Sequence, residues 1–222
     1  MKKILSFFLF LSLPTLCSAN LGIYGGLGVG ANILTGNQNA TVAALNEGRY
    51  PFKYGLRDSA ASGEVFAGWG HFFKSYYLGI EAFYSFLNST SEFKSTFAGT
   101  RQETITTKLK DGYGAALRVG YQIQDSVLAY VRLGMESRQL SVVFSDPNGY
   151  YVPLNKSYRS HAFVPGLGME LKCTNNLHFR FEVRSAFYEN KNVAVEQNAT
   201  NYSRISTKPK LHTFLVGLVY RI

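Results

Sequence analysis

Residues 211–222, LHTFLVGLVYRI, are the segment of the chain that is most informative about its fold. One parity of this stretch is entirely apolar or aromatic, whereas the other mixes polar residues and glycine with leucine and valine. Successive side chains of a β-strand point to opposite faces, so the pattern predicts a strand with one fully apolar face. The residues of that face are Phe214, Val216, Leu218, Tyr220 and Ile222.

The same alternation recurs along the chain. It is clearest in residues 177–187, where Phe179 and Phe181 alternate with Arg180 and Glu182. A face of alternating charges backed by an apolar face is typical of a two-sided strand. Counting residues 211–222, eight strands are predicted. The other seven are residues 21–33, 61–71, 76–86, 112–123, 127–136, 162–172 and 177–187.

The spacing of these strands predicts the topology. Three connections are short, at residues 72–75, 124–126 and 173–176, and they alternate with four long ones at residues 35–60, 87–111, 137–161 and 188–209. An up-and-down meander has this alternation when its tight turns lie at one end, as in bacterial outer-membrane barrels. The sequence therefore predicts an all-β, eight-stranded antiparallel transmembrane barrel with four long extracellular loops and short periplasmic turns.

The direction of the apolar face distinguishes two kinds of barrel. A soluble, lipocalin-like barrel would turn that face inward to hold a hydrophobic ligand. A membrane barrel would turn it toward lipid and leave glycine and charged residues in the lumen. The many glycines of the mixed face suit a crowded interior, which favours the membrane barrel. The mean hydropathy of −0.05 is then an average of an apolar exterior, a charged lumen and polar loops.

The first residues predict export. Lys2 and Lys3 precede an apolar run that ends in the small-residue pattern 17–19, CSA, so residues 1–19 are expected to be a cleaved signal peptide. The barrel domain would then be residues 20–222, with a formal charge of +7 in place of +9. Cys173 would be the single remaining cysteine, which excludes an internal disulfide and a zinc site built on several cysteines. We expect no cofactor.

Five short motifs resemble the OmpA-type eight-stranded transmembrane domain. They are residues 78–84 (LGIEAFY), 130–134 (YVRLG), 165–170 (PGLGME), 180–182 (RFE) and 219–222 (VYRI). The chain has no counterpart of the peptidoglycan-binding domain, so it resembles the barrel-only, OmpX-, Ail- and Opa-like surface proteins. The resemblance implies a location in the bacterial cell outer membrane. It also implies that the apolar face of the last strand is a C-terminal assembly signal read by the outer-membrane assembly machinery, although this chain ends in Ile222 where the family usually has phenylalanine.

Five acidic and five basic residues lie on the predicted lumenal parity. They are Glu64, Glu81, Arg118, Arg132, Glu136, Glu170, Arg180, Glu182, Arg184 and Arg221. Buried ions need partners, so these residues are expected to form ion pairs that fill the barrel. By resemblance, Glu81, Arg132, Glu170, Arg180 and Glu182 match the family's lumenal charge cluster. A proton or ion path through these charges is the alternative to a plug.

Basic residues outnumber acidic ones in the predicted loops. They include Arg49, Lys53, Arg57, Arg101, Lys108, Lys110, Lys156 and Arg159, together with Lys94, Arg204, Lys208 and Lys210. Their expected partners are outer-membrane lipids and lipopolysaccharide, whose phosphates attract cations. Adhesion to an acidic host surface ligand is a second interpretation. The dispersed charges argue against nucleic acid.

The residues favour a structural or surface protein without catalytic activity. An outer-membrane lipid-modifying enzyme or hydrolase is an alternative, because His161 lies in a predicted loop with Ser145, Asp146 and Ser160 nearby. No metal-ligand spacing is present in the sequence. A narrow, porin-like channel is a further alternative.

Overall fold

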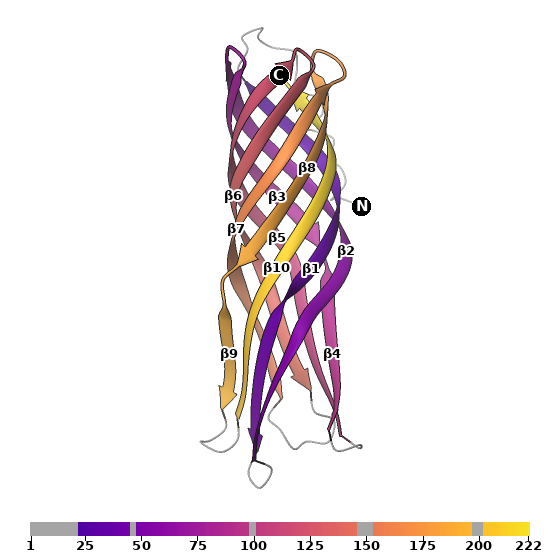
Figure 1. Ribbon diagram of the computed structural model, residues 1–222, viewed down its shortest axis with the longest axis vertical. Coiled ribbons are helices and arrows are strands. Elements are labelled where there is room, and N and C mark those ends of the chain that lie inside the picture. Colours follow the sequence, from indigo (N-terminus) through magenta and orange to yellow (C-terminus); the bar gives the residue numbers. More distant parts are fainter. Residues whose placement is uncertain (1–21, 45–47, 98–100, 146–152, 197–201) are drawn as a thin grey trace, which may run out of the picture.

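The structure is a computed structural model that describes residues 22–44, 48–97, 101–145, 153–196 and 202–222. In this part of the chain, ten strand segments form one tall antiparallel sheet (Figure 1). They are β1 (Ile23–Ala44), β2 (Gly48–Phe73), β3 (Tyr76–Leu87), β4 (Ser89–Phe97), β5 (Arg101–Gln124), β6 (Val127–Ser145), β7 (Leu154–Lys172), β8 (Leu177–Tyr188), β9 (Lys191–Glu196) and β10 (Tyr202–Arg221). The described residues include no helix of the length and hydrophobicity of a membrane span. The expected signal peptide, residues 1–19, lies outside them.

The sheet closes into a ring. Each strand pairs with its neighbour, and β1 pairs with β10 from Tyr24↔Arg221 to Ala43↔Tyr202. β4 continues β3 along the same side of β5, and β9 continues β8 along β10. The described strands therefore occupy eight positions around the ring. The predicted all-β, antiparallel barrel is confirmed.

Half of the barrel, at the end with the short turns, is apolar on its outer surface. In β3, exposed and buried residues alternate from Tyr76 to Leu87, so that Leu78 and Ile80 face outward and Glu81 faces inward. The other strands of this half alternate in the same way, and their outward-facing residues are also largely apolar. Examples are Leu27, Val29, Leu167 and Phe214. The band is about ten residues long on each strand, the length with which a tilted strand crosses a bilayer.

The predicted long loops are wrong. Residues 35–60, 87–111, 137–161 and 188–209 are mostly strand where they are described, and β2 alone runs for 26 residues. The strands continue as long hairpins beyond the apolar band, and we call this part of the barrel the extension. Its residues still alternate, but their polarity is reversed: in β1, Asn37 and Asn39 face outward, whereas Leu34 and Ala40 are buried. The predicted segments stop where this reversal begins.

The ring divides into two sheets in the extension. The β2–β3 ladder ends at Ser62↔Leu87, and the β7–β8 ladder ends at Ala162↔Tyr188. Beyond these points β9, β10, β1 and β2 form one four-stranded sheet, in front in Figure 1, and β4, β5, β6 and β7 form the other. Both sheets contribute to a shared apolar core that includes Leu56, Ile105, Val142, Phe144 and Ile205. The extension is therefore a β-sandwich that grows out of a membrane barrel.

The division begins at a bulge in β5. The β5–β6 register shifts between Leu109 and Gly112, and this shift moves the inward parity of β5 from odd to even residues. Asp111 lies in the bulge, and its Oδ1 accepts a hydrogen bond from the Leu87 backbone N–H at 2.9 Å, where β3 ends. The Asp111 carboxylate thus provides an acceptor for the Leu87 N–H at the point where β3 ends and the two sheets begin to separate.

The two sheets are bridged at the seam between β2 and β4. Asp58 Oδ2 accepts hydrogen bonds from Ser89 Oγ at 2.6 Å and from the Thr90 backbone N–H at 2.7 Å. One residue earlier in β2, the Arg57 backbone N–H donates to Ser91 Oγ at 3.2 Å. Side chains therefore replace the missing backbone ladder, and the exposed edges of β2 and β4 are covered.

Candidate functional site

The ten charged residues predicted for the lumen all lie on the inner face of the barrel. Nine are buried, and Arg221 is half-buried at the end with the short turns. They form two connected groups of ion pairs along the barrel axis, and Glu136 lies in a third group nearer the extension.

The first group surrounds Glu170 and Glu81. Glu170 accepts hydrogen bonds from Arg118, from Arg180 at 3.1 and 3.2 Å, and from Arg221 at 2.5 Å. Arg180 Nη2 also lies 2.8 Å from Glu81 Oε2. Two carboxylates on β3 and β7 are thus shared among three arginines on β5, β8 and β10. Charge-assisted contacts of this kind join strands on opposite sides of the ring.

The second group contains Arg132, Glu182, Arg184 and Glu64. Arg132 Nε lies 3.5 Å from Glu182 Oε1 and 3.9 Å from Glu81 Oε1, so it links the first group to the second. Arg184 donates to both oxygens of Glu64, one of them at 3.1 Å, and lies 3.4 Å from Glu182 Oε1. The alternating charges give each buried ion at least one partner of opposite sign.

The third group includes residues that the sequence analysis missed. Glu136 accepts hydrogen bonds from Tyr188 Oη and from Arg138, whose Nε also lies 3.0 Å from Tyr188 Oη. Arg138 is fully buried and donates to the Lys110 carbonyl in the β5 bulge at 3.1 Å. Arg138 has the same parity as Arg132 and Glu136, so extending the predicted strand 127–136 by two residues would have found it.

Aromatic rings fill the space between the lumenal charges. The guanidinium carbon of Arg118 lies 3.8 Å from the Tyr130 ring centroid, and that of Arg180 lies 3.8 Å from the Phe66 centroid. Tyr130 Oη also donates to Glu182 at 2.9 Å. Glycine makes room for these rings, because a Cβ on Gly168 would lie 2.2 Å from Tyr130 Cζ. The lumen is filled by side chains at this level, as expected for eight strands.

Cations lie on the outer face of the β2–β1–β10 sheet, just beyond the apolar band. One row of cross-strand neighbours is Val183, Phe214, Ala31 and Ala61, and it is apolar. The next row is Ser185, His212, Ile33 and Ser59. The row after that is Phe187, Lys210, Thr35 and Arg57. The polarity therefore changes over two rows, about 14 Å along the strands.

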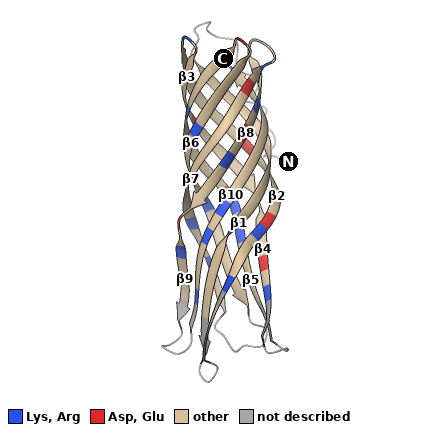
Figure 2. Cartoon of the chain, in the orientation of Figure 1, with Lys and Arg blue, Asp and Glu red and all other residues tan. Residues whose placement is uncertain are grey.

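Further cations follow on the same face. Lys208 lies beside Asn37, Lys53 beside Asn39 and Arg204 beside Thr41. We call Lys53, Arg57, Arg204, Lys208 and Lys210 the basic face. All five are exposed, and no acidic residue occupies these rows of the described sheet. Figure 2 shows the cations of β10 and β2 in the extension.

The remaining predicted basic residues do not join this face. Lys108 and Lys110 lie on β5, and Lys156 and Arg159 lie on β7, all in the second sheet of the sandwich. Arg159 stacks on Tyr113 with its guanidinium carbon 4.9 Å from the ring centroid. Lys94 lies 3.9 Å from Glu92. The side chains of Arg49 and Arg101 lie outside the described part of the chain.

The apolar parity of the last strand lies on the outer surface. Phe214, Leu218, Tyr220 and Ile222 are exposed, and Val216 is half-buried. Ile222 donates its backbone N–H to the Ile23 carbonyl at 3.0 Å, so the end of β10 is held against β1. These residues belong to the barrel wall as well as to the expected assembly signal.

The structure does not assemble the residues considered for catalysis. Ser160 is fully buried, whereas its neighbour His161 is exposed and points to the opposite face of β7. His161 pairs with Ser137, which is far along β6 from Ser145, and Asp146 lies outside the described residues. Among the described residues a different serine, Ser185, contacts a histidine: its Oγ lies 2.9 Å from His212 Nδ1 on the outer surface. In the described part of the chain, no three or more histidine, cysteine, aspartate or glutamate residues are grouped so that they could hold a metal ion.

Comparison with known proteins supports this fold. The model of the outer membrane protein beta-barrel domain family matches residues 4–221. The outer membrane protein OprG from Pseudomonas aeruginosa is 10% identical with a TM-score of 0.55, covering 91% of this chain and 97% of that chain. The outer membrane protease OmpT from Escherichia coli is 11% identical with a TM-score of 0.50, covering 94% and 100%.

Ail, the attachment invasion locus protein of Yersinia pestis, is 13% identical with a TM-score of 0.41, covering 87% of this chain and 98% of that chain. No curated protein matches the sequence significantly. At these identities the solved structures are similar in fold alone.

Proposed function

Because the chain belongs to the outer membrane protein beta-barrel domain family, we propose that it is a non-conducting surface protein that binds lipopolysaccharide through Arg57, Lys208 and Lys210, the part of the basic face nearest the apolar band. Its location is the bacterial outer membrane. The β-sandwich extension then stands above the outer leaflet, since the short turns of such barrels face the periplasm.

The position of the basic face carries this proposal. Arg57 and Lys210 flank Thr35 in one row, which is separated from the last apolar row of the wall by a single mixed row. Phosphate groups of the outer leaflet lie at this depth, where a cation interacts with them favourably. Lys208, one row farther out, is close enough to contact the same headgroup. The two flanking strands thus supply the charge, and β1 supplies hydroxyl and amide groups.

Native mass spectrometry of the full-length chain in detergent can test this proposal. We expect the double variant Arg57→Gln/Lys210→Gln to bind bisphosphorylated lipid A about tenfold more weakly, because two charge-assisted contacts are lost. Lys74→Asn is the control, since Lys74 is a cation on a short turn at the opposite end. Equal binding by the double variant, or equal binding of dephosphorylated lipid A, would contradict the proposal.

The lumen supports a role without conduction. Arginine and aromatic side chains fill it at the level of Glu81 and Glu182, and each of these carboxylates has several partners. In planar bilayers the folded protein is expected to show no discrete conductance steps. Regular steps in wild-type recordings would support the channel alternative.

Adhesion to an acidic glycan is the second candidate function. Lys53 and Arg204 lie two and three rows beyond Arg57 and Lys210, farther from the apolar band than the lipid phosphates. The variant Lys53→Gln/Arg204→Gln is expected to reduce retention of the protein on sulfated dextran and to leave lipid A binding unchanged. Retention equal to that of the wild type would exclude this second function.

The enzyme alternative can be tested separately. OmpT, a protease, is similar in fold alone, and His161 does not meet Ser160 or Ser145 in the structure. Ser185 and His212 form the one serine–histidine contact between described side chains, but His212 has no hydrogen bond to a carboxylate among the described residues. We expect a fluorophosphonate probe to leave the folded protein unlabelled. Labelling that disappears in Ser185→Ala would favour a hydrolase.

A further inference from the structure

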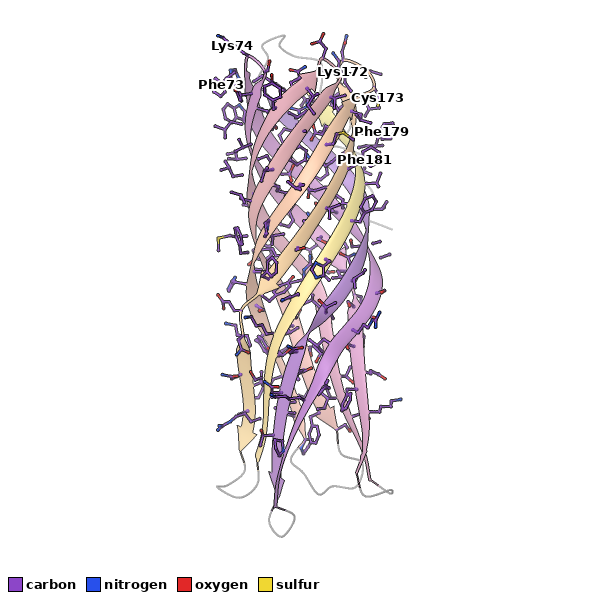
Figure 3. The ribbon with its side chains drawn as sticks, in the orientation of Figure 1. Phe73, Lys74, Lys172, Cys173, Phe179 and Phe181 are labelled. Atoms are coloured by element: carbon purple, nitrogen blue, oxygen red, sulfur yellow. The ribbon has the colours of Figure 1, made fainter. Side chains whose placement is uncertain are left out.

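A cavity of about 370 Å³ opens at the end of the barrel with the short turns. Its wall includes Gln122, Glu170, Lys172, Asn176, His178 and Arg221. Figure 3 labels Lys172 and Cys173 at this end of the molecule, with Phe73 and Lys74 on another short turn, across the ring. The cavity lies far from the basic face, so its chemistry is independent of the proposed lipopolysaccharide contact.

Three strands hold the basic side chains of this cavity in place. Lys172 on β7 pairs with His178 on β8, and both have the inward parity. On the other side of β8, the Arg221 backbone N–H donates to the Asn176 carbonyl at 2.8 Å. Asn176 Nδ2 donates to the Arg221 carbonyl, also at 2.8 Å. The positions of Lys172, His178 and Arg221 are therefore fixed by backbone pairing and by the two reciprocal hydrogen bonds between Asn176 and Arg221.

Two buried nitrogen atoms of these basic side chains have no hydrogen-bond partner among the described residues. They are Arg221 Nε and His178 Nε2. Glu170, the buried carboxylate of the cavity, already accepts from Arg118, Arg180 and Arg221. Buried N–H groups normally have acceptors. An acceptor supplied from outside the chain would satisfy both.

The cavity wall carries two cations, Arg221 and Lys172, and two carboxylates, Glu170 and Asp125. Glu170 is already shared by Arg118, Arg180 and Arg221, so its charge is neutralised from behind the wall. Asp125, on the exposed turn at the rim, is the other acidic residue of the wall. His71 and His178 add no negative charge in either protonation state.

We propose that this cavity binds a small oxyanion, a carboxylate or phosphate group, from the periplasmic side. Arg221 Nε donates to one oxygen of the anion, and His178 donates to another in its Nε2–H tautomer. Lys172 closes the site as a point charge at the rim. The bound group completes the hydrogen bonding of the two buried nitrogens.

NMR spectroscopy of the full-length chain in phosphatidylcholine nanodiscs can test this site. Inorganic phosphate and N-acetylalanine are each expected to shift the Arg221 Nε–H and His178 ring resonances saturably, whereas chloride at equal ionic strength does not. We expect His178→Gln and Arg221→Gln to weaken binding about tenfold, as for the loss of a charge-assisted hydrogen bond. Lys74→Asn, at the same end but outside the cavity wall, is expected to bind like the wild type.

A further arm identifies the source of the anion. Nanodiscs containing phosphatidylglycerol, with no added anion, would shift the same resonances if a lipid headgroup enters the cavity. Shifts in phosphatidylcholine nanodiscs with phosphate or N-acetylalanine support binding of a free anion. The proposal is overturned if none of the three gives a saturable shift, or if His178→Gln, folded with unchanged heat-modifiability on a gel, binds like the wild type.

Discussion

Glu64 and Arg184 show how single residues of the lumen depend on one another. They lie on β2 and β8, and Arg184 donates to both carboxylate oxygens of Glu64 in a buried site. The low dielectric of such a site strengthens the pair, and it also makes an unpaired partner costly. The pair therefore contributes mainly by preventing a buried, unmatched charge.

Replacing Glu64 by glutamine should reveal this dependence. We expect Glu64→Gln to lower the free energy of unfolding by about 3 kcal/mol, because Arg184 keeps its charge and retains only the weaker contact with Glu182. Urea unfolding of the protein refolded in detergent measures the change. Glu92→Gln, which removes an exposed pair with Lys94, should cost about 0–1 kcal/mol. Equal effects at the two sites would contradict a tightly coupled lumen.

Tyr54 gives the extension a dependence on alkaline pH. Its ring stacks on Phe93 at 4.4 Å, and its buried hydroxyl has no partner among the described residues. Burial raises the pKa of Tyr54 above its usual value, and the same cause raises the pKa of Tyr158. A raised pKa means that the neutral phenols are stabilised by folding. This contribution is complete below the unfolded pKa of about 10 and is lost as the pH rises toward the folded pKa.

The variant Tyr54→Phe/Tyr158→Phe isolates this effect. At pH 7 we expect its extension to be as stable as that of the wild type, or more stable by about 1 kcal/mol, because two unsatisfied buried hydroxyls are removed. Between about pH 10 and 12 the wild type should lose protection of its β4 and β9 amides faster than the variant. Hydrogen exchange measures both. Parallel loss of protection in the two proteins would show that these tyrosines do not control the alkaline transition.

At the scale of elements, Asp58 holds the edge of β4 against β2. Asp58→Ala removes the acceptor for Ser89 Oγ and for the Thr90 backbone N–H. We expect faster proteolysis and faster amide exchange in β4, with the barrel below unchanged, because about two net hydrogen bonds are lost at one seam. Asp125→Ala, on an exposed short turn, is the control. Unaltered exchange in β4 would mean that the seam is held by core packing alone.

Strands within the apolar band could be predicted from sequence, and strands in the extension could not. In residues 23–33 and 211–222, a two-residue alternation coincides with one uniformly apolar face. In the extension, the outward residues of β1 become polar at Thr35, and the bulge at Lys110 and Asp111 shifts the parity of β5. A single sequence shows such changes as a loss of pattern, so it predicts loops for these segments.

The candidate sites divide in the same way. Parity alone placed the ten lumenal charges on one face, but it did not reach Arg138, which follows the predicted end of a strand. The basic face depends on the registers β1–β2 and β1–β10, which bring Arg57 and Lys210 into one row from residues far apart in the chain. Lysines and arginines predicted as one dispersed group therefore belong to different sheets.

For the whole molecule, the central feature is a reversal of polarity along one continuous barrel. Between the short-turn end and Ile33 in β1, apolar residues face outward and charged groups fill the interior. From Thr35 onward, in the extension, polar residues face outward and the core includes Leu56, Ile105 and Phe144. The outer surface of the half with the short turns suits lipid, and the outer surface of the extension suits water. The two directions of the apolar face considered from the sequence thus both occur in one chain, outward in the barrel and inward in the β-sandwich extension.

Collision accessibility of spin labels along β1 tests this reversal most directly. In a Cys173→Ser background, single labels are placed at Leu27, Val29, Asn37 and Asn39, which share the outward parity. The protein is studied in lipid bilayers with oxygen and with a water-soluble nickel complex. We predict that oxygen dominates at Leu27 and Val29, and that the nickel complex dominates at Asn37 and Asn39. Lipid-like accessibility at Asn37 and Asn39, or aqueous accessibility at Val29, would contradict the account.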